Sequence, residues 1–185
     1  LRTRRQRQMC IRDRNKIKSQ FIKLTESFKN VNKLQINYAV KASSNISILK
    51  YLINMGAGID AVSIQEVELA VRAGVEPNKI IYTPNGVSLD EIEKVAKIGA
   101  KINIDNLAVL EEFGNKHKKI PVCIRINPHI MAGGNSKISV GHIDSKFGIS
   151  IHQAPHIERI VENTGLIING VPVSYTHLTL PTSPK

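Results

Sequence analysis

Short runs of β-branched and other apolar residues alternate with longer stretches of helical periodicity along most of the chain. The first four runs begin about 22 residues apart, near positions 35, 58, 79 and 102. Parallel strands need a connection long enough to hold a helix, so this alternation predicts repeated βα units and a parallel sheet. The predicted strands are Leu34–Val40, Gly58–Val62, Lys79–Tyr82, Ile102–Ile104, Pro121–Ile126 and Leu166–Val171.

The stretches between these strands carry apolar residues every three or four positions, which is the period of an amphipathic helix. Two of them have typical boundary residues, because Ser63 precedes one and Gly74 ends it, and Ser88 and Gly99 bracket the next. A further helix is expected ahead of the first strand. The predicted helices are Lys16–Val31, Ile46–Met55, Ile64–Ala73, Leu89–Ile98, Leu107–Lys116 and His152–Asn163.

Two fold types contain such a parallel sheet: an open doubly wound sheet and a closed barrel. A doubly wound sheet usually has a glycine-rich phosphate-binding turn after its first strand, but Val40 is followed by Lys-Ala-Ser-Ser-Asn. A (β/α)8 barrel accommodates the regular spacing and needs roughly 250 residues. Six strands therefore predict an α/β fold that is an incomplete (β/α)8 TIM barrel, interrupted during the sixth strand.

The two ends of the chain differ from the rest in composition. Residues 1–14 contain six arginines and one aspartate without a clear helical or strand period, and residues 172–185 contain three of the eight prolines. We expect residues 15–171 to form the folded domain and both ends to be non-native or disordered tails. The alternative is a native basic tail and a native C-terminal loop.

A net charge of +11 would usually suggest nucleic acid or an acidic membrane as a partner. Residues 1–14 carry +5 and residues 172–185 carry +1, which leaves +5 for residues 15–171. The lysines of that central part lack interleaved aromatic side chains, and no apolar run reaches the roughly 18 residues of a membrane helix. We therefore expect a cytoplasmic protein with no nucleic-acid partner and no membrane partner.

Neither the cysteines nor the histidines predict a disulfide framework or a metal site. Cys10 and Cys123 are 113 positions apart, and Cys123 lies within a strand-like run. His152 and His156 have the spacing of helical metal ligands, but Pro155 lies between them and no carboxylate motif accompanies them. We expect no metal.

Lys41 follows the apolar run Ile36–Val40, at the expected carboxyl end of the first strand. In a barrel this end of the strands forms the active face. A partly desolvated pocket disfavours the charged form of an amine, so a larger fraction is neutral and able to form a Schiff base. The position of Lys41 alone favours the alternative, a solvated lysine that ends a strand.

The segment Tyr38–Ala42 resembles the cofactor-lysine motif of the ornithine/diaminopimelate/arginine decarboxylase family, which has the pyridoxal-phosphate fold type III. The similarity covers roughly residues 30–171 in order, and so is more specific than one short motif. It implies an alanine-racemase-like barrel, pyridoxal 5′-phosphate as cofactor and a C-terminal β-domain absent from this chain. Other matching segments are Gly58–Ser63, Ile80–Thr83, Arg125–Pro128 and Asp144–Ile149.

The resemblance implies roles for four residues. Lys41 would carry the cofactor, and Ala39 would lie behind the cofactor ring. Asp60 would lie near the Schiff-base lysine and Arg125 would orient the cofactor from the end of the fifth strand. The alternatives are an ordinary carboxylate at a helix start for Asp60 and a strand-end salt bridge for Arg125.

Two nearby residues suggest helix caps. Glu66 lies three residues after Ser63, which favours a capping-box partner. Ser43 stands where the family usually has asparagine, and its hydroxyl could still cap the following helix.

Within the family, the run Asn127–Ile149 is most similar to bacterial members that convert meso-2,6-diaminopimelate to L-lysine and carbon dioxide. The resemblance therefore implies a carboxy-lyase for a small amino-acid substrate, active as a homodimer. The alternatives are an ornithine, arginine or carboxynorspermidine decarboxylase, or a non-catalytic pyridoxal-phosphate-binding regulatory barrel. Loops after the last strands usually hold the cofactor phosphate in such barrels, so we expect the 185-residue chain alone to be inactive.

Overall fold

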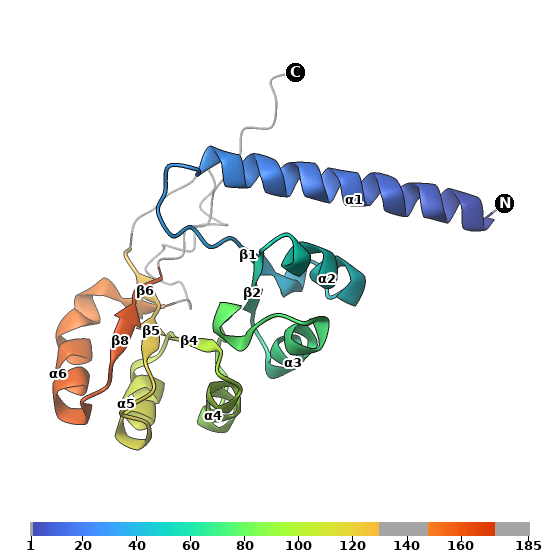
Figure 1. Cartoon of the computed structure of the whole chain (residues 1–185). Helices are drawn as coiled ribbons and strands as arrows, with labels where there is room; N and C mark the ends of the chain where they lie inside the picture. Colours follow the sequence, from blue (N-terminus) through green and yellow to red (C-terminus); the bar gives the residue numbers. More distant parts are fainter. Residues whose placement is uncertain (1, 130–147, 173–185) are drawn as a thin grey trace. The chain divides into compact units, whose positions relative to one another are not determined.

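The computed structural model describes residues 2–129 and 148–172, with side chains from Arg14 onward (Figure 1). The chain divides into two units, residues 1–36 and residues 37–185. The first unit contains α1 (Arg2–Ser27), which begins well before the predicted start at Lys16. The reason is that no proline or glycine interrupts residues 2–27. That residues 1–14 are non-native stays a prediction.

The second unit is built on a six-stranded parallel sheet in the order β1-β2-β3-β4-β5-β8. A doubly wound sheet reverses its strand order at a switch point, whereas here the order follows the chain without reversal. This confirms the predicted barrel-type sheet. The strands are β1 (Asn37–Ala39), β2 (Gly58–Ala61), β3 (Ile80–Tyr82), β4 (Lys101–Ile104), β5 (Val122–Ile124) and β8 (Ile168–Gly170).

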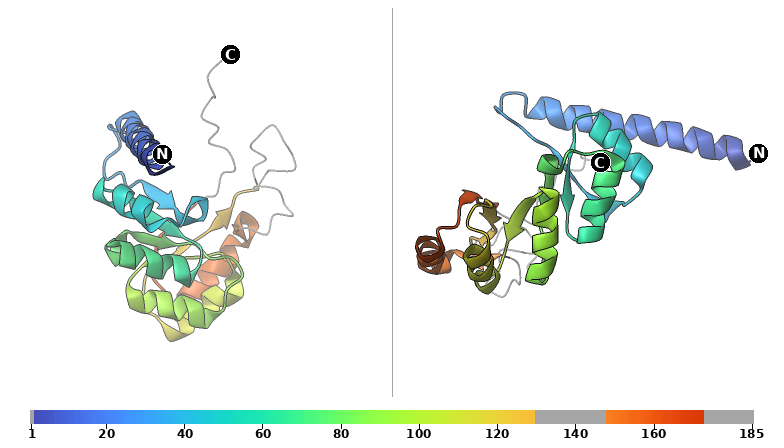
Figure 2. Two further views of the ribbon diagram at one scale, coloured as in Figure 1. Left: turned by 90° about the vertical axis from the view of Figure 1, so that its right-hand side faces the viewer. Right: turned by 60° about the horizontal axis from the view of Figure 1, so that its bottom comes forward.

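Helices connect the strands and follow one another along the outer side of the curved sheet (Figures 1 and 2). Their bounds agree with the predicted periods, except that His152 lies in a short 3-10 helix (η4, Ile151–Gln153) ahead of α6. None of the described helices is long and apolar enough to span a membrane. The helices are α2 (Ile46–Asn54), α3 (Ile64–Ala73), α4 (Leu89–Ile98), α5 (Leu107–Lys116) and α6 (Ala154–Thr164).

Side-chain caps fix where these helices begin. The Ser63 hydroxyl accepts a hydrogen bond from the backbone N–H of Glu66 at 3.3 Å, and the Glu66 carboxylate accepts one from the backbone N–H of Val62 at 2.8 Å. The capping role expected for Glu66 is thus confirmed. The cap expected from Ser43 is wrong, because Asn45 Oδ1 accepts from the backbone N–H groups of Ser47 and Ile48 in the first turn of α2.

The sheet presents one apolar face to the helices. Side chains alternate between the two faces of a strand. The register places the buried residues of each strand beside buried residues of the neighbouring strand on this face. Fully burying such a side chain contributes about 1.5–3 kcal/mol, so this layer is the main source of stability. The buried residues are Ile59, Ala61, Ile80, Tyr82, Ile102, Ile104, Val122 and Ile124.

The fifth strand differs from the prediction of one strand over Pro121–Ile126. β5 ends at Ile124, and Ile126–Asn127 (β6) pairs with Ile149–Ser150 (β7) in a separate two-stranded sheet. The backbone changes partner at Arg125, whose N–H donates to Ile104 O at 2.9 Å and whose carbonyl accepts from Ile149 N at 2.8 Å. Gly148 permits this crossing, because a Cβ there would lie 3.0–3.1 Å from the backbone of β6 and Arg125.

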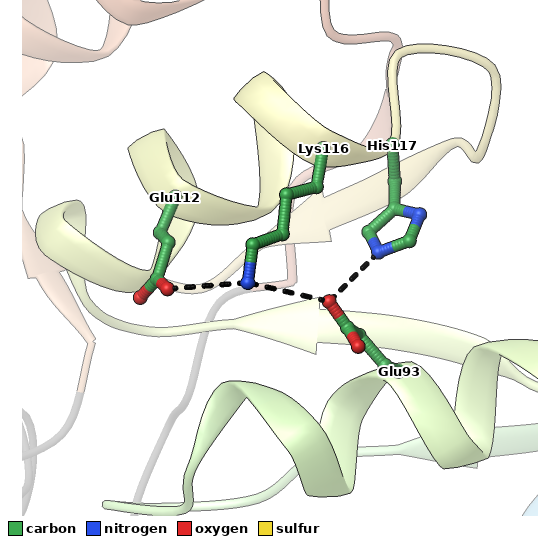
Figure 3. A network of polar contacts seen from close by, with 4 residues as sticks. All are labelled: Glu93, Glu112, Lys116 and His117. Carbon is green, nitrogen blue, oxygen red and sulfur yellow. Dashed lines mark hydrogen bonds and ion pairs between the residues drawn. The ribbon is translucent and has the colours of Figure 1, made fainter.

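The helices α4 and α5 are joined at the surface by a polar network (Figure 3). Glu93 Oε1 on α4 lies 3.0 Å from His117 Nε2 and 3.8 Å from Lys116 Nζ. Lys116 in turn lies 3.5 Å from Glu112 one turn earlier on α5. The His117 ring also packs on Phe113, with 4.9 Å between ring centroids, so the end of α5 is held by both polar and apolar contacts.

Candidate active site

Polar and small side chains gather on the face of the sheet opposite the apolar one. Ala39 pairs with Asp60, and the pairing of Ile104 with Ile124 places the next residues, Asp105 and Arg125, opposite each other. Because side chains alternate along a strand, residues two apart share a face. The set at the carboxyl ends of β1 to β5 on this face, called here the polar face, is Ala39, Asp60, Thr83, Asn103, Asp105 and Arg125.

Asp60 is the end of a chain of side-chain hydrogen bonds on the polar face. Its Oδ1 accepts from the Thr83 hydroxyl at 3.1 Å, and Thr83 Oγ1 accepts from Asn103 Nδ2 at 2.8 Å. Burial raises the pKa of Asp60 above its ordinary value of 3.8, while the Thr83 hydrogen bond and the charges of Lys41 and Arg125 oppose this rise. Asp60 is therefore a half-buried carboxylate held by specific partners.

Arg125 lies among two carboxylates on the same face. Burial lowers the pKa of its guanidinium, while the charges of Asp105 and then Asp60 oppose this change, and Arg125 remains a cation. Burial also raises the pKa of Asp105, against the attraction of Arg125. Within the described residues, the buried Oδ2 of Asp105 has no hydrogen-bond partner. Asp105 thus has a carboxylate oxygen that can accept a hydrogen bond.

Lys41 lies in a 3-10 turn (η1, Val40–Ala42) directly after β1, and its side chain is exposed. The partly desolvated pocket expected around it is not found among the described residues. The reason is that β1 is the first strand of the sheet and has β2 as its neighbour on one side only. The charge of Lys41 nevertheless acts on Asp60 across that pair of strands.

A cavity of about 320 Å³ lies beside Asn103 and Asp105 of the polar face, between the loop after β3 and the start of α5. Asn103 and Asp105 line it together with Asn85, Val87 and Val109. The cavity therefore extends the polar face toward the outer helices, with both apolar and amide side chains in its wall.

A second polar cluster forms where β6 meets β7. His129 Nε2 lies 2.7 Å from Ser150 Oγ, and the His129 ring stacks on His152 with 5.3 Å between centroids. No group of three metal-ligating side chains occurs in the described parts of the chain. Of the run Asn127–Ile149, which carries part of the family resemblance, residues 130–147 lie outside the described residues.

The chain matches a family of known proteins over most of its length. The family model described as "Pyridoxal-dependent decarboxylase, pyridoxal binding domain" matches residues 14–175. The chain belongs to this family. Pyridoxal phosphate is accordingly its cofactor, as predicted from the motif around Lys41.

Relatives within the pyridoxal-dependent decarboxylase family include diaminopimelate decarboxylases. The enzyme of Helicobacter pylori strain J99 is 39% identical over 147 residues, and that of Campylobacter jejuni is 36% identical over 156 residues. These matches cover 77% and 82% of this chain but 36% and 39% of the relatives. The chain thus spans less than two fifths of the length of either relative.

A solved structure gives the same picture of the fold. The crystal structure of diaminopimelate decarboxylase from Helicobacter pylori complexed with L-lysine is similar with a TM-score of 0.75 and 34% identity. The match covers 86% of this chain and 41% of that one. This confirms the fold as part of a decarboxylase barrel.

The residues of the polar face, together with Lys41 directly after β1, fit a pyridoxal phosphate. Lys41 offers a primary amine for the cofactor aldehyde, and Arg125 offers a fixed cation for an anionic oxygen. The small side chain of Ala39 lies opposite Asp60 in the register and leaves space beside that carboxylate. The unpartnered Asp105 oxygen, within the described residues, gives a further acceptor. The individual roles of Lys41, Ala39, Asp60 and Arg125 stay predictions.

Thr83, Asn103 and Asp105 belong to the site but were not predicted from the sequence. A signal for them was present, because each stands at the carboxyl end of a predicted strand or directly after it. In a parallel sheet these ends meet at one edge, which is where sites of barrel enzymes lie. The structure adds the register that puts the three side chains on the same face as Asp60.

Proposed function

We propose that the whole protein is a pyridoxal-phosphate-dependent decarboxylase that converts meso-2,6-diaminopimelate to L-lysine and carbon dioxide. The observation that carries this proposal is the position of Lys41 after β1, next to the strand that holds Asp60, in a chain of this family. The relatives from Helicobacter pylori and Campylobacter jejuni are named diaminopimelate decarboxylases, and the similar crystal structure is titled as a complex with L-lysine.

Lys41 and several residues of the polar face have tasks in this proposal. Lys41 would hold the cofactor covalently through its amine. Bound pyridoxal phosphate supplies a sink for the electron pair that remains when the carboxylate of an amino acid leaves as carbon dioxide. Arg125 would bind an anionic oxygen of the cofactor, and Asp60 would place negative charge close to Lys41.

Ala39 and the polar face also orient what binds there. The small side chain of Ala39 would let a flat ring lie against β1. Asp105 would keep the Arg125 guanidinium directed toward the polar face through their mutual attraction. Decarboxylation requires the scissile bond to be held in one orientation, so fixed side chains around the reacting group are the contribution of the protein.

The proposal includes a small amino acid as the partner of the site. It also includes a homodimer, which rests on the family resemblance alone, and a location in the cytoplasm, which rests on the sequence expectation. Two other functions can be distinguished by the substrate that the protein turns over. A polyamine-type decarboxylase would use ornithine, arginine or carboxynorspermidine, and a regulatory barrel would turn over no substrate.

The experiment measures carbon dioxide and L-lysine released by the whole protein with pyridoxal phosphate and meso-diaminopimelate. Ornithine, arginine and carboxynorspermidine are supplied in parallel. Lys41→Ala is expected to abolish release, and Lys50→Ala, at an exposed position of α2, is the matched control that keeps it. Turnover of another substrate in place of diaminopimelate would reassign the enzyme, and no turnover of any would favour the regulatory barrel.

A further inference from the structure

We propose that Thr83 and Asn103 are positioning residues that hold the Asp60 carboxylate in place through a relay of side-chain hydrogen bonds across β2, β3 and β4. The chemical use of this relay rests on the proposed function. The relay itself is a property of the chain, and it can be tested without the cofactor.

The direction of the relay follows from the chemistry of its members. An amide nitrogen only donates, so Asn103 Nδ2 at 2.8 Å donates to Thr83 Oγ1. A hydroxyl has a single proton to donate, and with its oxygen already accepting from Asn103, that proton is directed to Asp60 Oδ1 at 3.1 Å. The two hydrogen bonds therefore support one another.

The backbone fixes the relay relative to the strands. The N–H of Thr83 donates to the carbonyl of Ala61 at 2.8 Å, which ties the end of β3 to the end of β2. Asn103 is only 5% exposed within β4, and its neighbour Ile102 pairs with Tyr82 of β3. Thr83 consequently reaches Asp60 from a rigid position rather than from a free loop.

Asp60 has a reason to need such a partner. Burial disfavours its charged form, and the charge of Glu66 at the start of α3 acts in the same direction. The charges that oppose these effects come from Lys41 after β1 and Arg125 after β5. Between a cation on either side, a carboxylate could turn toward either one. The Thr83 hydroxyl holds one oxygen, which fixes how the other is presented.

The test follows the side-chain carboxyl carbon of Asp60 by ¹³C NMR across pH in the 185-residue chain without cofactor, with Asp60→Asn used for assignment. In Thr83→Val, which keeps the shape and removes the hydroxyl, the pKa of Asp60 is expected to rise further. In Thr83→Ser, which keeps the hydroxyl, it is expected to stay at the wild-type value. Asn103→Leu is expected to raise it by less than Thr83→Val.

An unchanged Asp60 titration in Thr83→Val would overturn the relay, and so would an equal rise in Thr83→Val and Thr83→Ser, because the change would then come from packing. If Thr83→Val does not fold, the Asn103→Leu titration decides, and an unchanged value there refutes the proposal.

A second readout connects the relay to the cofactor. The pH dependence of the absorbance of the protein loaded with pyridoxal phosphate is expected to move in Thr83→Val and to return in Thr83→Ser. A wild-type protein that takes up no pyridoxal phosphate would refute the proposed function, while the carboxyl titration would still decide the relay.

Discussion

Tyr82 and Glu91 form a polar contact within the core, and its removal should destabilise the fold. The Tyr82 side chain is fully buried on the apolar face, and its hydroxyl donates to Glu91 Oε1 at 2.7 Å. The same oxygen accepts from the backbone N–H of Ile64 at 3.1 Å, so Glu91 joins β3, the start of α3 and the first turn of α4. Burial and the adjacent carboxylate raise the pKa of Tyr82, which keeps the phenol a donor.

The expected magnitude follows from these contacts. A hydrogen bond to a charged group is worth about 1.5–3 kcal/mol, and Tyr82→Phe leaves Glu91 its second donor, so we expect a loss near the lower end, about 1.5 kcal/mol. Glu91→Ala leaves the Tyr82 hydroxyl buried without its acceptor and removes a cap from α3. We expect it to cost about 2–3 kcal/mol.

The assay is urea denaturation followed by circular dichroism, with the free energy of unfolding taken by linear extrapolation. Tyr38→Phe is the matched control, because the Tyr38 hydroxyl donates to the Ser43 carbonyl over a long 3.4 Å contact in a part-buried site. It should cost less than about 0.5 kcal/mol. The double variant Tyr82→Phe/Glu91→Ala should lose less free energy of unfolding than the sum of the losses of the two single variants. A Tyr82→Phe loss no larger than the control loss would show that the hydrogen bond to Glu91 does not stabilise the fold.

Three further predictions use other contacts. Gly114→Ala should destabilise the chain by about 1–3 kcal/mol in thermal denaturation, because its Cβ would lie 2.8 Å from Thr164 Oγ1 between α5 and α6. Glu93→Gln should cost stability at neutral pH but not in acid. The reason is that the His117 hydrogen bond lowers the pKa of Glu93 from 4.5. The stabilisation from ionised Glu93 is therefore fully present above pH 4.5 and is lost as the pH falls through the lowered pKa of the folded state. Asp105→Asn should stabilise the chain at neutral pH, since burial raises the pKa of Asp105 from 3.8, and the gain should vanish below that value in pH-dependent urea titrations.

The order of strands and helices could be predicted from the sequence because each element carries its own period. The runs at Gly58–Val62 and Ile102–Ile104 and the helical stretch Ile64–Ala73 all appear close to their expected bounds. Unbroken sequential order also follows from the spacing, since each crossover is long enough for one helix and returns to the neighbouring strand.

The features that the sequence could not supply depend on contacts between distant residues. The split of the fifth strand at Arg125 requires the close approach of Gly148, and the local run Pro121–Ile126 contains no sign of it. The exposure of Lys41 follows from the place of β1 in the sheet rather than from the residues around it. The hydrogen bonds of Thr83 depend on strand register, which a period of two leaves open.

The N-cap of α2 could not be predicted from the sequence either. Ser43 and Asn45 are both good N-cap residues, and the sequence does not say which of them the first turn of α2 meets. The 3-10 turn over Val40–Ala42 sets the choice, because Ser43 ends that turn and the helix then starts after Asn45.

The proposed attachment of pyridoxal phosphate to Lys41 can be tested by locating the modified lysine. The whole protein is incubated with the cofactor, reduced with borohydride and mapped by peptide mass spectrometry. We expect one modified lysine, at Lys41, that is lost in Lys41→Ala and kept in Lys50→Ala. Modification of Lys137 or Lys146 in its place, or unchanged uptake of the cofactor by Lys41→Ala, would show that Lys41 does not carry the cofactor.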